Sequence, residues 1–180
     1  MRTVKLTQPD CWRQMPPQGE LRAWLTDRGS LTARIIANVD DFNLQRLQQR
    51  LATPYHDERR ALGLRQGELA LVREVILRDG VTPLIFAHTA ANPRDLRGAW
   101  RGLSKLGNRP LAEMLFHDPT VCRMAIEYKQ LSPTHPLIDA TMAATNLLRQ
   151  LSPQHLWARR SVFLKNGRPL MVTEVFLRCL

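Results

Sequence analysis

Two tight turns, each flanked by β-rich residues, constrain the fold of this chain more than any other feature of its sequence. The first lies at Asp79–Gly80 within residues 68–89, and the second lies at Asn166–Gly167 within residues 156–177. Asp-Gly and Asn-Gly pairs favour the positive φ angles of two-residue hairpin turns. The sequence therefore predicts two antiparallel hairpins, one in the middle of the chain and one near its end.

Two further strands and several short helices are expected around these hairpins. Residues 121–131 alternate apolar and polar side chains, and residues 42–51 do so more weakly. Residues 92–107 suggest a long irregular connection, because asparagine, proline and glycine recur in them. Apolar residues at three-and-four spacing predict short helices at residues 21–25 and 31–36, the second with Ser30 as its cap. Pro110 at a first helical position predicts another over residues 111–116, and residues 137–150 are compatible with a helix. Six antiparallel strands with short helices, and no βαβ alternation, make the expected class α+β.

Length and composition limit how this fold can be organised. With 180 residues and 44% hydrophobic content, the chain can bury one core but is too short for two ordinary domains. We expect one domain over residues 1–180, acting as a monomer. The N-terminus lacks the apolar segment of a secretory signal, and no apolar run approaches a membrane span. The cysteines are odd in number and widely spaced, which favours free thiols in a cytoplasmic protein.

The net charge of the chain favours anionic ligands but does not show which kind. Lysine and arginine number 26 against 16 acidic residues, a formal charge of +10. A positive field attracts nucleic acids, anionic membrane surfaces and small acidic substrates alike.

Two charged residues lie on strand faces that are otherwise apolar. Side chains alternate between the faces of a strand, so Arg73 shares a face with Leu71 and Val75. Glu174 likewise shares a face with Val172 and Phe176 on the last strand. A buried charge needs an opposite charge, a ligand or water. The residues alone leave two readings open: a structural pair between Arg73 and Glu174, or a binding site.

His88 lies near the end of the first hairpin, on a face with Leu84 and Phe86. A single histidine in this setting is more often a hydrogen-bonded core residue than a functional one. The other histidines show no metal-ligand spacing; they are His56, His117, His135 and His155.

Several common site motifs are missing from the sequence. It contains no HExxH, no G-x-S-x-G and no dinucleotide-binding glycine pattern. Gly102 and Gly107 have the spacing of a phosphate-binding loop, but Asn108 and Arg109 follow where lysine and serine or threonine are required. We therefore expect neither a metal nor an organic cofactor.

A set of segments resembles the chorismate pyruvate-lyase family. The segments are WLTDRGSLTARI, REVILRDG with a return strand ending in FAHT, LSKLGNRPLAEMLF, and LWARRSVFLKNGRPLMVTEVFL. Together they extend over most of residues 24–178, in order and without large gaps. The resemblance implies a six-stranded antiparallel sheet with helices, and a ligand enclosed between the sheet and two covering flaps.

The resemblance also implies roles for five residues. Arg73 would grip the ring carboxylate of the ligand, and Glu174 would meet the hydroxyl of 4-hydroxybenzoate. Leu31 and Leu111 would be apolar flap residues that close over the ring. His88 departs from the family pattern, which has arginine there, and it would lie near the departing enolpyruvyl group, where its charge would depend on pH.

The implied activity is the conversion of chorismate to 4-hydroxybenzoate and pyruvate, the first committed step of ubiquinone biosynthesis. The resemblance implies chorismate as the small-molecule substrate, and we expect no cofactor, no metal, no membrane span and no nucleic-acid partner. Two rivals remain. The same fold occurs in effector-binding domains of transcription regulators, but we expect the residues before the first helix to be too few for a DNA-binding helix-turn-helix. A nucleic-acid-binding protein would cluster its basic residues, which here are scattered.

Overall fold

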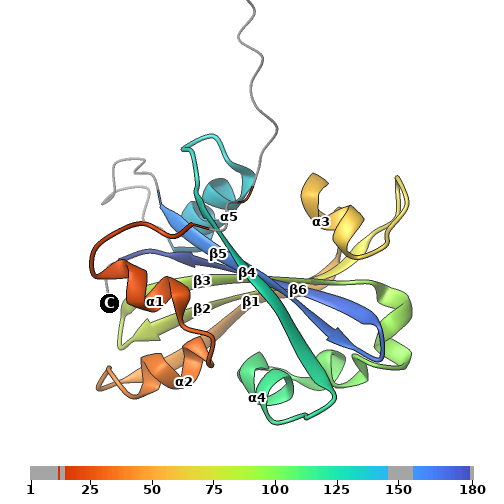
Figure 1. The fold of residues 1–180 in the computed structure, drawn as a ribbon, viewed down its shortest axis with the longest axis horizontal. Helices are drawn as coiled ribbons and strands as arrows, with labels where there is room; N and C mark the ends of the chain where they lie inside the picture. The colour runs from red at the N-terminus through yellow and green to blue at the C-terminus, as the bar shows by residue number, and fades with distance from the viewer. Residues whose placement is uncertain (1–11, 13–14, 146–155, 179–180) are drawn as a thin grey trace, which may run out of the picture.

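The described residues form one six-stranded sheet with short helices on both of its faces (Figure 1). The computed structural model describes residue 12 and residues 15–145 and 156–178. The strand order is β1-β2-β3-β6-β5-β4, and every neighbouring pair is antiparallel. The strands are β1 (Phe42–Ala52), β2 (Ala70–Asp79), β3 (Thr82–Ala91), β4 (Val121–Gln130), β5 (Trp157–Lys165) and β6 (Arg168–Phe176). The predicted α+β class and the six antiparallel strands are confirmed.

The helices are short and divide between the two faces of the sheet. They are α1 (Leu21–Thr26), α2 (Leu31–Ile36), α3 (His56–Ala61), α4 (Leu111–Phe116) and α5 (Pro136–Thr145), with 3₁₀ helices η1 (Pro93–Arg97) and η2 (Arg101–Lys105). Helices α1, α2 and α4 pack against the face that carries Val75 and Val172. Helix α5 and the residues that follow α3 cover the opposite face, which carries Ile76 and Val72. Both faces are therefore core, as the apolar strands require.

Most of the predicted helices occur where the spacing placed them. Helix α3 was not predicted, and the connection expected to be irregular contains η1 and η2. Pro110 is the N-cap of α4 rather than its first helical residue. The predicted helix over residues 137–150 is present as α5 up to Thr145, and its remainder lies outside the described residues. Among the helices of the described residues, none is long and apolar enough to span a membrane.

The second hairpin forms as the sequence predicts. Asn166 and Gly167 have φ angles of 51° and 72°, and Lys165 pairs with Arg168 across the turn. Asparagine and glycine tolerate this left-handed region, so they allow a two-residue turn that matches the strand twist.

The first hairpin differs by one residue from the prediction. Asp79 pairs with Thr82, so the turn residues are Gly80 and Val81 rather than Asp79 and Gly80. The register then shifts by one between Arg78 and Leu77. A one-residue shift moves every later side chain of one strand to the other face. This shift decides on which face the residues of β3 lie.

Candidate active site

The site is a cavity between the sheet and the helices α2 and α4. The empty space there, open solvent included, is about 570 Å³. Four of the five predicted site residues line it: Arg73, Glu174, Leu31 and Leu111. Most of the remaining wall is apolar, with Leu44, Val75, Leu77, Ala87, Leu115, Phe116, Phe163 and Val172.

The strand register brings the charged residues to one face. Arg73 of β2 lies opposite Thr89 of β3, and Glu174 of β6 lies opposite Ala87 of β3. Directly opposed residues in antiparallel strands point to the same face, and residues two apart in one strand do so as well. Arg73 and Glu174 therefore meet the same cavity from strands that are not neighbours.

Arg73 is a buried cation without an acidic partner among the described residues. Only 1% of it is exposed. Its Nη2 donates to the carbonyl oxygens of Gly107 at 3.2 Å and Arg109 at 3.0 Å, while its Nε has no hydrogen-bond partner in the described chain. Burial, together with the nearby Arg46, lowers the pKa of Arg73 to about 10, so it stays charged at neutral pH. Such a group is available to an anionic ligand.

Glu174 pairs with Arg159, not with Arg73. Its Oε2 accepts from Nε of Arg159 at 2.6 Å, and Arg159 is 1% exposed. The structural pair that the sequence left open, between Arg73 and Glu174, is therefore not the one that forms. No hydrogen bond to Oε1 of Glu174 occurs within the described residues, and this oxygen can accept from a ligand.

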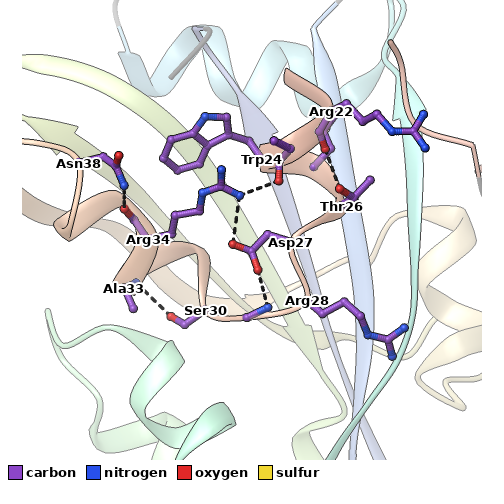
Figure 2. Close-up of polar contacts among 12 residues, drawn as sticks. Arg22, Trp24, Thr26, Asp27, Arg28, Ser30, Ala33, Arg34 and Asn38 are labelled. Atoms are coloured by element: carbon purple, nitrogen blue, oxygen red, sulfur yellow. Dashed lines mark hydrogen bonds and ion pairs between the residues drawn. The ribbon is translucent and has the colours of Figure 1, made fainter. Parts of the chain in front are cut away.

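The segment that joins α1 and α2 contributes Gly29 to one side of the cavity. A polar cluster fixes the shape of this segment (Figure 2). Oδ1 of Asp27 accepts from the Gly29 amide at 2.7 Å, and Oδ2 pairs with Nη1 of Arg34 at 3.1 Å. The Arg34 guanidinium also lies over the Trp24 ring, 4.1 Å from its centroid. Ser30 caps α2 by accepting from the Ala33 amide, which confirms the predicted cap. The helix presents Leu31 to the cavity.

Helix α4 closes the other side with Leu111, Ala112, Leu115 and Phe116, and the segment before this helix contacts Arg73. Gly107 has a φ angle of 59°, a conformation that glycine adopts without strain. The carbonyl groups of Gly107 and Arg109 turn towards Arg73 and accept from it. Helix α4 begins directly afterwards and presents Leu111 to the cavity. The same arginine that can bind an anion therefore also holds this segment in place.

A family model described as chorismate lyase matches residues 4–180. The chain belongs to the chorismate lyase family. A probable chorismate pyruvate-lyase from Nitrosomonas europaea is 44% identical over 176 residues, which are 97% of each chain. One from Nitrosospira multiformis is 46% identical over 157 residues, 87% of this chain and 85% of that protein. The protein is thus an enzyme of the lyase class.

Solved structures with the same fold come from transcription regulators. A GntR-family regulator from Bacillus cereus aligns with a TM-score of 0.55 and 14% identity, over 77% of this chain and 92% of that one. The ligand-binding domain of a putative GntR-family regulator from Bordetella bronchiseptica aligns with a TM-score of 0.52 and 19% identity, over 77% of this chain and 85% of that one. At such identities the likeness concerns the fold alone.

The sequence patterns did not predict two arginines of this chorismate lyase-family site. Arg159 and Arg123 both line the cavity. Arg159 could have been found, because a two-residue turn at Asn166–Gly167 sets it directly opposite Glu174. Arg123 gave no comparable signal, since the register of β4 against β5 shifts between Arg123 and Ile126.

His88 is separated from the other predicted site residues. It lies opposite Glu74 rather than Arg73, and its side chain points to the other face of the sheet. Its Nδ1 is 3.0 Å from Oε1 of Glu74, and its Nε2 is 3.1 Å from Oε1 of Glu58. Burial alone would lower the pKa of His88, but the two carboxylates raise it to about 9. The geometry thus contradicts the expected position of His88 beside the ligand, and the reason is the shifted register of the first hairpin.

Proposed function

We propose that this enzyme converts chorismate to 4-hydroxybenzoate and pyruvate, as the first committed step of ubiquinone biosynthesis. The observation that carries the proposal is Arg73, a fully buried guanidinium without an acidic partner in the described chain, in the wall of a largely apolar cavity. Chorismate and 4-hydroxybenzoate both combine an apolar six-membered ring with a carboxylate, which matches this combination of surfaces.

In the proposed complex, Arg73 holds the ring carboxylate. A guanidinium binds a carboxylate through two parallel N–H bonds, a geometry that lysine cannot supply. The ring hydroxyl, which lies opposite the carboxylate on the ring, donates to Oε1 of Glu174. Leu31 and Leu111 cover the ring from the two flanking segments. His88 has no part in this complex, because it lies on the other face of the sheet.

The proposed reaction is an elimination with no net redox change. The ether bond between the ring and the enolpyruvyl oxygen breaks, the ring carbon that bears the hydroxyl loses its proton, and the electrons of that C–H bond complete the aromatic ring. The departing enolpyruvate gains a proton and becomes pyruvate. Because aromatisation drives the reaction, the task of the protein is to hold the ring, exclude water and stabilise the charge on the leaving oxygen.

A direct assay tests the proposal. Purified protein is incubated with chorismate, with and without a chelator, and 4-hydroxybenzoate and pyruvate are quantified as chorismate disappears. We expect the two products in equal amounts, at the same rate with and without the chelator. A loss of activity that only a divalent ion restores would contradict the cofactor-free reaction. Tight binding of 4-hydroxybenzoate without turnover would instead favour a sensor, the role that the regulators' shared fold suggests.

A further inference from the structure

We infer that Arg123 is a second anion-binding residue of the cavity and binds the enolpyruvyl carboxylate of the substrate. This inference rests on the proposed function, because it assigns the second of the two carboxylates of chorismate. It makes Arg123 a determinant of specificity for the dianionic substrate over the product 4-hydroxybenzoate, which has one carboxylate.

The cavity carries a net positive charge. Among the described residues that line it, the ionisable groups are three guanidinium groups and one carboxylate, a net charge of +2. Glu174 neutralises Arg159 through their ion pair. Arg73 and Arg123 remain, and neither has an ion pair with a described acidic residue. A ligand with two negative charges would balance this cavity, and a ligand with one would leave a cation uncompensated.

The contacts of Arg123 leave one nitrogen for a ligand. Its Nε donates to Oγ of Ser161 at 2.9 Å, and its Nη1 donates to the carbonyl oxygens of Arg28 and Gly29 at 3.1 Å and 3.2 Å. Its Nη2 makes no hydrogen bond within the described residues. The guanidinium also lies 5.3 Å from the centroid of the Phe163 ring, another residue of the cavity wall. The side chain is thus fixed on three sides and still has two N–H groups to donate.

The two uncompensated cations come from well-separated strands. Arg73 is on β2 and Arg123 on β4, and three strands lie between them in the sheet order. Chorismate has its carboxylates on different substituents of the ring, one attached directly and one at the end of the enolpyruvyl ether. With the ring carboxylate on Arg73, the second carboxylate must extend towards another part of the wall. Arg123 is the cation found there without an acidic partner in the described chain.

A structural role for Arg123 predicts a different outcome. Through the carbonyl groups of Arg28 and Gly29, the side chain helps to hold the segment that leads into α2. If this were the whole contribution of Arg123, its loss would lower the affinity for every ligand that Leu31 covers, irrespective of the ligand's charge. If Arg123 binds the second carboxylate, its loss weakens the binding only of ligands that carry this second carboxylate.

Two stable aromatic probes separate these roles. 4-Hydroxybenzoate has one carboxylate, and 3-(carboxymethoxy)-4-hydroxybenzoate adds a second at the position of the enolpyruvyl group. Calorimetric titration of the whole chain with each probe is carried out for the parent, Arg123→Gln and Arg123→Lys. Arg60→Gln is the matched control, because Arg60 is exposed on α3 and its loss removes the same charge from a helix that does not line the cavity. Melting temperatures report whether each variant folds.

We expect Arg123→Gln to lose about 10- to 100-fold in affinity for the dicarboxylate, the scale of one charge-assisted contact, and less than about twofold for 4-hydroxybenzoate. Arg123→Lys should lie between the parent and Arg123→Gln, and Arg60→Gln should match the parent. Equal losses for both probes, or no loss for either, would overturn the inference. So would a parent protein that does not bind the dicarboxylate. Chorismate turnover is measured separately. If Arg123→Gln loses affinity only for the dicarboxylate but the parent does not turn over chorismate, the result contradicts the proposed reaction and not the second anion site.

Discussion

At the scale of single residues, the two charged side chains found on apolar strand faces are stabilised in different ways. Glu174 forms an ion pair with Arg159, whereas Arg73 has only two backbone carbonyl groups as hydrogen-bond partners among the described residues. Moving an ion out of water costs several kcal/mol unless its charge is balanced. Arg73 is therefore a group whose environment improves when an anion binds.

Replacement of Arg73 by lysine should keep the charge and lose the planar pair of donors. We expect affinity for 4-hydroxybenzoate to fall by about 1.5–3 kcal/mol, the scale of a charged hydrogen bond, with little change in melting temperature. Calorimetric titration of Arg73→Lys against the parent measures this. Unchanged affinity would show that Arg73 serves only to hold the segment before α4.

Replacement of Glu174 should reveal the cost of leaving Arg159 buried without its carboxylate. We expect Glu174→Ala to lower the free energy of unfolding by about 1–3 kcal/mol, and Glu174→Gln to lower it less, because the amide oxygen still accepts a hydrogen bond. Urea unfolding of both variants gives the comparison. Equal destabilisation by the two changes would mean that the hydrogen bond contributes nothing.

These residues also show how far the sequence could predict the site. Arg73 and Glu174 were recognisable because a charge on an apolar face needs a partner or a ligand. The partner of Glu174 was implied by the Asn166–Gly167 turn, which fixes the register of β5 against β6. The position of His88 was not predictable, because it depends on a register shift between Arg78 and Leu77 for which the sequence has no clear signal.

At the scale of elements, the cavity is covered by helices too short to be stable alone. Helices α2 and α4 have six residues each, far below the length at which isolated helices form in water. The position of α2 depends on its Ser30 cap. Both helices also depend on arginines from the sheet, Arg123 for α2 and Arg73 for α4, which donate to the carbonyl groups of the preceding segments. Composition and spacing predicted the helices, but the contacts that hold them join residues far apart in the chain and could not be read from local pattern.

The cap of α2 offers a test of this dependence. Ser30→Ala removes the bond to the Ala33 amide and should cost about 1 kcal/mol of stability. Because Leu31 directly follows the cap, affinity for 4-hydroxybenzoate should also fall, by a few-fold. Ser30→Asn is the matched control, since asparagine caps helices as well as serine does. If Ser30→Ala and Ser30→Asn bind the ligand equally well, the cap does not position Leu31.

At the scale of the whole molecule, the two faces of the sheet have different tasks. The face with Arg73 and Glu174 lines the cavity, and the opposite face encloses the ionic cluster of His88, Glu74 and Glu58. His88 is 3% exposed, and Glu58 belongs to α3. The cluster therefore links α3 to the neighbouring strands β2 and β3. Its protonation bears on stability rather than on the cavity.

The pH dependence of stability follows from the raised pKa of His88. The group titrates near 6.5 when unfolded and at about 9 when folded, so its charged form stabilises the fold. This contribution is complete below about pH 6.5 and is lost as the pH rises through about 9; its full size is on the order of 3 kcal/mol. His88→Arg keeps the cation at all these pH values. In urea unfolding between about pH 6 and pH 10, the free energy of unfolding should fall more steeply with rising pH for the parent than for His88→Arg. Parallel curves would contradict the assignment of this pH dependence to His88.

The central claim is that the cavity between the sheet, α2 and α4 is where the aromatic acid binds. A crystal structure of the protein with 4-hydroxybenzoate tests it most directly. The ligand should lie under Leu31 and Leu111, with its carboxylate within hydrogen-bond distance of the Arg73 guanidinium and its hydroxyl within the same distance of Glu174. A ligand bound elsewhere, or one in this cavity with its carboxylate away from Arg73, would contradict the claim.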